Sequence, residues 1–114
     1  MAKPIPTRLH AVLDYVTGPT LIALPRLAGW DQKATTLLTA AGGGVLAYSM
    51  LTRYELGLVK VLPMVGHLAL DFTSGVTLAA APFLFVKDEN SVVKNTLMAV
   101  GLFEIGASLL TQTA

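Results

Sequence analysis

The sequence contains no cysteine, so disulfide bonds and thiol chemistry are excluded. It is also poor in charge, because 13% of its 114 residues are charged, whereas an average soluble domain has about 25%. A soluble domain this small is mostly surface and needs charged residues to cover it. Since the chain lacks them and 54% of its residues are hydrophobic, we predict that its natural surroundings are lipid.

Basic residues are few and dispersed. The formal net charge is +1, and no run of lysine or arginine marks a nucleic-acid footprint. Nucleic acid is therefore not an expected partner. The N-terminus, which begins MAKPIPTRLH, is not typical of a secretory signal, because its apolar run contains His10 and Asp14 and no small-residue cleavage site closes it.

Four apolar segments predict four helices, at about residues 9–27, 34–51, 63–86 and 93–110. Each has roughly the 20 residues that a helix needs to cross the hydrocarbon core of a bilayer. Short charged stretches separate them, so neighbouring helices should run antiparallel. We therefore predict one all-α domain over residues 1–114, a four-helix transmembrane bundle with four spans and both termini on the same side.

An internal repeat relates the first and third segments. The stretch HAVLDYVTGPTLIALP begins at His10, and HLALDFTSGVTLAAAP begins at His67. Histidine, aspartate, glycine and proline occur at matching positions in both. The sequence thus predicts two tandem helical hairpins, at about residues 8–57 and 65–114, related by a pseudo-two-fold axis along the membrane normal.

The H-x-x-x-D-x-x-x-G opening and the central stretch LTRYELGLVKVLPM resemble the SPW-repeat family, small bacterial membrane proteins built from two-helix repeats. The resemblance covers nearly the whole chain. It implies an integral protein of the bacterial cytoplasmic membrane, and it carries over no biochemical activity, so function is left open. The Ser-Pro-Trp motif of the family is Leu-Pro-Arg at 24–26 and Ala-Pro-Phe at 81–83. Only the proline survives, so no role of the serine or tryptophan is carried over.

Five ionisable residues lie inside the predicted helices: His10, Asp14, His67, Asp71 and Glu104. Such residues cost about 2.5–3.5 kcal/mol each on insertion scales and are candidate functional sites. Within each repeat the histidine and aspartate are four residues apart, so they share one helix face. A polar seam is expected between the first and third helices. Glu104 is expected to approach Asp71 or His67.

Small residues predict where helices pack closely. Gly18 and Gly75 follow each aspartate by one turn and leave room for another backbone. Gly43 and Ala47 offer a partner surface on the second helix. We also expect bends or helix ends at three prolines, because proline cannot donate the backbone hydrogen bond of a helix. These are Pro19, Pro25 and Pro82.

Three interpretations of the polar seam remain open. In the first, which we expect, it is mainly structural, and each aspartate accepts hydrogen bonds that fix the helix pairing. In the second, Asp14, Asp71 and Glu104 conduct protons or ions. In the third, the histidines and carboxylates bind a metal or cofactor. We expect no enzymatic activity, no catalytic residue, and no resident metal or cofactor. The expected partners are the lipid bilayer and a second copy of the chain.

Overall fold

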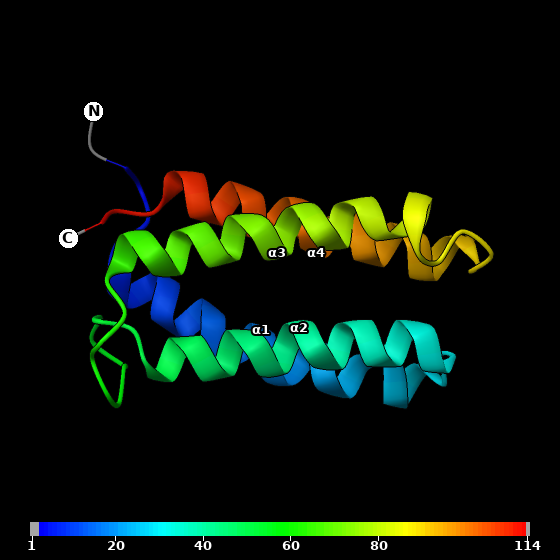
Figure 1. Ribbon diagram of the computed structural model, residues 1–114, viewed down its shortest axis with the longest axis horizontal. Helices are drawn as coiled ribbons and strands as arrows, with labels where there is room; N and C mark the ends of the chain where they lie inside the picture. The colour runs from blue at the N-terminus through cyan, green and yellow to red at the C-terminus, as the bar shows by residue number, and fades with distance from the viewer. Residues whose placement is uncertain (1–2, 114) are drawn as a thin grey trace.

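The computed structural model describes residues 3–113, and within them the chain forms four helices joined by loops (Figure 1). These are α1 (Thr7–Ala28), α2 (Gln32–Met50), α3 (Met64–Leu84) and α4 (Ser91–Leu110). The all-α prediction is confirmed. α1 packs along α2 and α3 along α4, which gives two hairpins. α1 and α3 begin at the same end of the molecule, where both ends of the described chain also lie (Figure 1).

The second helix of each hairpin starts at the same kind of cap. The side chains of Asp31 and Asn90 each accept a hydrogen bond of 3.0 Å from the backbone N–H three residues later, which satisfies a free donor of the first turn. α1 ends at Gly29, whose φ of 70° is the left-handed conformation that glycine adopts without strain. These local signals fix the turns at the end of the molecule opposite the termini.

The helices continue through the prolines at which bends or ends were expected. Pro19 and Pro25 both lie inside α1, and Pro82 lies inside α3. Both helices nevertheless end shortly after Pro25 and Pro82. The Pro25 carbonyl accepts hydrogen bonds from the backbone N–H groups of Gly29 and Trp30. It therefore belongs to the C-terminal cap of α1.

The prediction of four membrane spans is wrong. Among the described residues, only α3 and α4 are long and apolar enough to cross a membrane, by length and composition. α1 includes Arg8, Asp14 and Arg26, and α2 begins with glutamine and lysine and contains three threonines and three glycines. The sequence prediction counted the length of the apolar segments and gave these polar and small residues too little weight.

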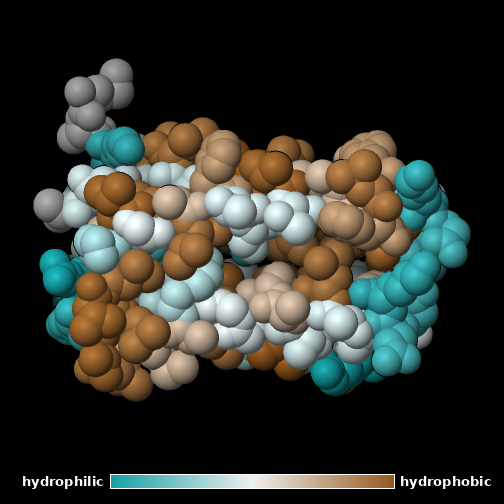
Figure 2. Space-filling view, viewed as in Figure 1, coloured by the Kyte–Doolittle hydropathy of each residue, from teal (hydrophilic) through white to brown (hydrophobic). Residues whose placement is uncertain are grey.

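Large apolar side chains are exposed along the sides of the molecule. In the most apolar windows of α3 and α4, 39% and 33% of residues are buried, so most of each helix is not covered by the rest of the chain. Figure 2 shows hydrophobic residues over much of the visible face and hydrophilic residues gathered at the end formed by the α1–α2 and α3–α4 loops. Exposed apolar residues of this size are more numerous than single surface residues usually are.

The interior is divided along the length of the bundle. The half nearer the α1–α2 and α3–α4 loops is apolar and contains side chains from all four helices and one from the α3–α4 loop, namely Leu21, Ala34, Leu38, Leu78, Ala81, Val86, Val93 and Leu97. The buried ionisable side chains lie in the other half, near the starts of α1 and α3. The large apolar cluster therefore holds the hairpins together at one end. At the other end a smaller apolar cluster of Ala11, Tyr54, Met64 and Leu68 and the polar side chains join them.

Within each hairpin the helices touch at a pair of glycines. A Cβ atom added to Gly42 would lie 2.5 Å from the carbonyl oxygen of Gly18, and one added to Gly101 would lie 2.5 Å from that of Gly75. The packing surface predicted at Gly43 and Ala47 is therefore located at Gly42 instead. Successive residues of a helix point about 100° apart, so Gly43 faces away from the contact at Gly42. A Cβ added to Gly43 would have nothing within 4 Å, and Ala47 is exposed.

Gly101→Ala is expected to lower the free energy of unfolding by about 1–3 kcal/mol, the usual cost of overpacking. Its Cβ would meet backbone atoms, the amide nitrogen of Ala79 and the carbonyl oxygen of Gly75. The control is Gly106→Ala in the same helix, where the added Cβ meets nothing within 4 Å. That change should be neutral or should stabilise the helix by up to about 1 kcal/mol. Thermal unfolding followed by circular dichroism compares the two variants, and equal stability would contradict the close packing.

Candidate metal centre

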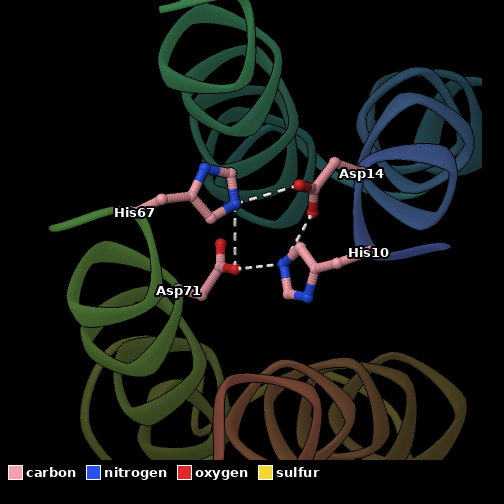
Figure 3. Close-up of side chains that lie close together, drawn as sticks. All are labelled: His10, Asp14, His67 and Asp71. Atoms are coloured by element: carbon pink, nitrogen blue, oxygen red, sulfur yellow. Dashed lines mark hydrogen bonds and ion pairs between the residues drawn. The ribbon is translucent and has the colours of Figure 1, made fainter. Parts of the chain in front are cut away.

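Four buried side chains from α1 and α3 converge at one point (Figure 3). They are His10, Asp14, His67 and Asp71, and one ligand atom from each lies within 4.8 Å of the others. None of the four is more than 7% exposed. The residues predicted from the repeated H-x-x-x-D therefore meet in a single cluster, which we call the His/Asp centre.

The His/Asp centre links the two hairpins more closely than it links residues of one helix. His10 Nε2 lies 2.7 Å from Asp71 Oδ2, on the other hairpin, and 3.4 Å from Asp14 Oδ1, on its own helix. His67 Nε2 lies 2.9 Å from Asp14 Oδ2 and 3.2 Å from Asp71 Oδ2. Each imidazole thus faces both carboxylates, and the shorter contact crosses between α1 and α3.

A threonine holds the other nitrogen of each histidine. His67 Nδ1 lies 2.7 Å from Thr52 Oγ1, and His10 Nδ1 lies 2.7 Å from Thr111 Oγ1. Both hydroxyls also lie within hydrogen-bond distance of a backbone carbonyl four residues earlier, at 2.6 Å for Thr52 and 2.5 Å for Thr111. A carbonyl only accepts, so the single hydroxyl proton goes to it. Each threonine oxygen therefore accepts from its histidine, and both Nδ1 atoms carry a proton.

Short backbone bridges position these threonines. Thr111, just after α4, pairs with Ile5, just before α1, and Thr52, just after α2, pairs with Leu62, just before α3. The bonds include Ile5 N–H to the carbonyl of Leu110 at 3.1 Å and the N–H of Arg53 to the carbonyl of Leu62 at 2.8 Å. Each histidine is thus supported by the chain segment that is tied to the start of its own helix.

Two tyrosines complete the surroundings of the carboxylates. The Tyr54 hydroxyl donates to Asp14 Oδ2 at 2.8 Å, and the Tyr48 hydroxyl donates to Asp71 Oδ1. Burial, together with the charge of Asp14, raises the pKa of the Tyr54 phenol, so it keeps its proton and remains a donor. Both rings also pack against His67, with centroids 4.8 Å (Tyr48) and 5.2 Å (Tyr54) from the imidazole.

Glu104 lies beside the centre without belonging to it. It is 5% exposed, and neither carboxylate oxygen accepts a hydrogen bond of acceptable geometry within residues 3–113, although the Ser74 hydroxyl lies near it. It lines a cavity of about 10 Å³ together with His10, Asp14 and Asp71. Glu104 was predicted to approach Asp71 or His67. In the structure Glu104 and Asp71 line the same cavity.

Glu104→Leu is expected to raise the free energy of unfolding of the metal-free protein by about 1–3 kcal/mol, the usual cost of an unsatisfied buried polar group. Leucine fills a similar volume and needs no hydrogen bond. The control is Glu55→Leu, because Glu55 is exposed and accepts a hydrogen bond of 2.9 Å from Thr7. That control should not gain stability. Denaturant unfolding measures both, and a destabilised Glu104→Leu protein would mean that the carboxylate has a partner.

Sequence reasoning missed the four supporting side chains, Tyr48, Thr52, Tyr54 and Thr111. A signal for the threonines was present, because the chain has S-M-L-T at 49–52 and S-L-L-T at 108–111. These motifs are 59 residues apart, as are the caps Asp31 and Asn90, whereas His10 and His67 are 57 apart. The α3–α4 loop is longer than the α1–α2 loop, so the second helices of the two hairpins align at a spacing of 59 residues, not 57. In the shifted register the counterpart of Glu104 is Val45, which lines the same cavity.

Comparison with protein-family models, with curated proteins and with solved structures finds no match to this chain. The resemblance to the SPW-repeat family therefore stays a prediction. Function has to be inferred from the geometry of the His/Asp centre and its surroundings.

Proposed function

We propose that this protein binds one divalent transition-metal ion between its two hairpins. The ligands are His10 Nε2, His67 Nε2 and one carboxylate oxygen each from Asp14 and Asp71. Two imidazoles and two carboxylates suit zinc, manganese or iron(II). Metal bonds of about 2.0–2.1 Å place tetrahedral ligand atoms about 3.3 Å apart. The nitrogen–oxygen distances to Asp71 Oδ2 and Asp14 Oδ2 are 2.7, 2.9 and 3.2 Å, and all four ligand atoms lie within 4.8 Å of one another, so side-chain adjustments would bring them to this spacing.

The observation that carries the proposal is the direction of the two Nε2 atoms. Both Nδ1 atoms donate to threonines, so in a neutral imidazole Nε2 presents a lone pair to the carboxylates, which is repulsive. Each Nε2 therefore needs a second proton or a shared cation. His67 Nε2 is 2.9 Å from Asp14 Oδ2 yet makes no hydrogen bond of acceptable geometry within residues 3–113. The His10 Nε2–Asp71 Oδ2 contact, in contrast, has hydrogen-bond geometry. His67 Nε2 also lies 3.2 Å from Asp71 Oδ2, so a cation bound to it would meet both carboxylates.

Outer contacts also support a metal, and its charge is compatible with the site. A divalent ion, two carboxylates and two neutral imidazoles sum to zero, as two carboxylates and two imidazolium ions also do. Metal-binding histidines usually donate their second N–H to an oxygen, and ligating carboxylates are usually hydrogen-bonded. Thr52, Thr111, Tyr48 and Tyr54 supply all four of these contacts.

In this function the ion acts as a clamp, which retains the structural role expected for the seam. It would join α1 to α3 at the end of the bundle that has the smaller of the two apolar clusters. The proton-path alternative has less support, because the apolar side chains Leu21, Leu38, Leu78 and Leu97 fill the interior beyond the centre. We further infer that the hairpins are tandem repeats, since caps, glycine contacts and S-x-x-T motifs recur in both.

For the surroundings of the protein, we infer that the α3–α4 hairpin contacts lipid. Its helices are 21 and 20 residues long, and large apolar side chains such as Val65, Phe72, Phe83 and Leu102 are exposed on them. Removing this surface from water favours insertion by roughly 25 cal/mol per Å² of apolar area. Membrane fractionation with an alkaline carbonate wash tests this inference, and a chain released into the soluble fraction would contradict it.

The metal proposal is tested by replacing the outer threonines. Thr52→Val or Thr111→Val removes the acceptor of a histidine Nδ1–H and should lower the affinity for zinc by about 10–100-fold. The control is Thr96→Val, because Thr96 also donates to a carbonyl four residues earlier, at 2.7 Å, but is half-buried in the first turns of α4, away from both histidines. Competition with a coloured chelator measures the affinities. Equal affinities in all three variants would contradict the proposed ligand set.

A further inference from the structure

We propose that the bound ion carries an exchangeable water molecule in the cavity beside Glu104, so that the centre is an open metal site able to take a small ligand. This inference rests on the metal centre proposed above. A site that served only as a clamp would be closed by its four protein ligands, as structural zinc sites usually are. The side chains around the cavity point instead to a fifth, non-protein ligand.

The cavity has the size and the position that such a ligand needs. Its volume of about 10 Å³ is close to the minimum that holds one water molecule. Three of the four proposed metal ligands, His10, Asp14 and Asp71, line it. A molecule in this space would therefore lie beside the ion.

Glu104 supplies the polar partner. Buried carboxylates are normally paired or hydrogen-bonded, because leaving them unpaired is costly. Glu104 is 5% exposed, and its oxygens accept no hydrogen bond of acceptable geometry within residues 3–113. A metal-bound water donates hydrogen bonds, and a carboxylate accepts them. The ion and Glu104 would thus hold the water from opposite sides.

Direct binding of Glu104 to the ion fits less well. Glu104 is not among the four residues whose ligand atoms lie within 4.8 Å of one another, whereas it does line the cavity next to them. A bridging water spans this separation. The asymmetry of the two hairpins points the same way, because Val45 occupies the corresponding position on α2 and also lines the cavity. Val45 thus gives the cavity an apolar wall on α2, and Glu104 supplies a hydrogen-bond acceptor on α4.

The test uses manganese(II)-loaded protein in D₂O and deuterium electron–nuclear double resonance, which detects exchangeable deuterons on a metal-bound water. We expect one bound water in the wild type and in Glu104→Gln, whose amide oxygen still accepts. Glu104→Leu fills the space and should lose the signal. The control is Ser108→Ala, one turn further along α4, because Ser108 is buried, donates to the Ile105 carbonyl and does not line the cavity. It should keep the signal.

The outcomes separate this inference from the metal proposal. Manganese content is measured first, by mass spectrometry of the loaded protein. A wild-type protein that takes up no ion overturns both the metal centre and the water. A wild type that takes up the ion but shows no deuteron signal overturns only the water, and so does a folded Glu104→Leu protein that keeps the full signal.

Discussion

Asp71→Asn is expected to lower the free energy of unfolding by about 3–5 kcal/mol, the cost of breaking a buried ion pair from one side. Asp71 Oδ2 lies 2.7 Å from His10 Nε2 and 3.2 Å from His67 Nε2, and Asp71 also accepts the Tyr48 hydroxyl. The amide carries no charge to balance an imidazolium or a metal ion. Denaturant unfolding in detergent, with and without saturating zinc, measures the change.

The matched control for this prediction is Asp88→Asn. Asp88 is exposed in the α3–α4 loop, where a surface substitution usually changes stability by less than about 0.5 kcal/mol. Asp71→Asn and Asp88→Asn proteins of equal stability would show that the His/Asp centre does not hold the hairpins together.

The second large effect concerns the affinity for metal. Replacing both histidines, as His10→Gln with His67→Gln, is expected to weaken zinc binding by more than about a hundredfold, beyond the 10–100-fold usual for loss of an outer contact. Both nitrogen ligands are lost, and the chain has no other histidine to replace them. Asp88→Asn again serves as the control and should bind zinc like the wild type. A double variant that binds zinc as tightly as the wild type would locate the ion elsewhere.

The His/Asp centre could be predicted in part from the sequence because its four ligands follow a simple rule. A histidine and an aspartate four residues apart share one helix face, and the pattern starting at His10 returns at His67. Two such helices that enter the bundle from the same end bring their pairs to the same depth. The sequence therefore predicted the residues and their meeting place, whereas the nitrogen directions that favour a metal required the structure.

The supporting shell could not be predicted in the same way. Tyr48 and Tyr54 reach the carboxylates from the end of α2 and the loop that follows it, and their sequence positions resemble those of aromatic residues at a membrane interface. Thr52 lies in a stretch with arginine and glutamate neighbours that is typical of a solvated turn, yet it is fully buried. Long-range backbone pairing buries it, and local sequence carries little information about such pairing.

The prediction of four membrane spans failed for a different reason. Segment length was a sound guide to the four helices, whose observed bounds lie within a few residues of the predicted ones. It was a poor guide to hydropathy in α1 and α2, where polar and small residues dilute the apolar ones. The residues that lower the hydropathy of α1 include His10 and Asp14, which are themselves part of the centre.

The most direct test of the central claim is the metal content of the wild-type protein, purified without chelators and then titrated with zinc, manganese and iron(II). We expect one divalent ion per chain, an unfolding temperature that rises with the ion and falls again with a chelator, and nitrogen and oxygen ligands at about 2.0–2.2 Å in X-ray absorption. A folded protein that contains no ion, takes up none in the titration and shows no change in unfolding temperature would contradict the metal centre. The two histidines would then be held by protons alone.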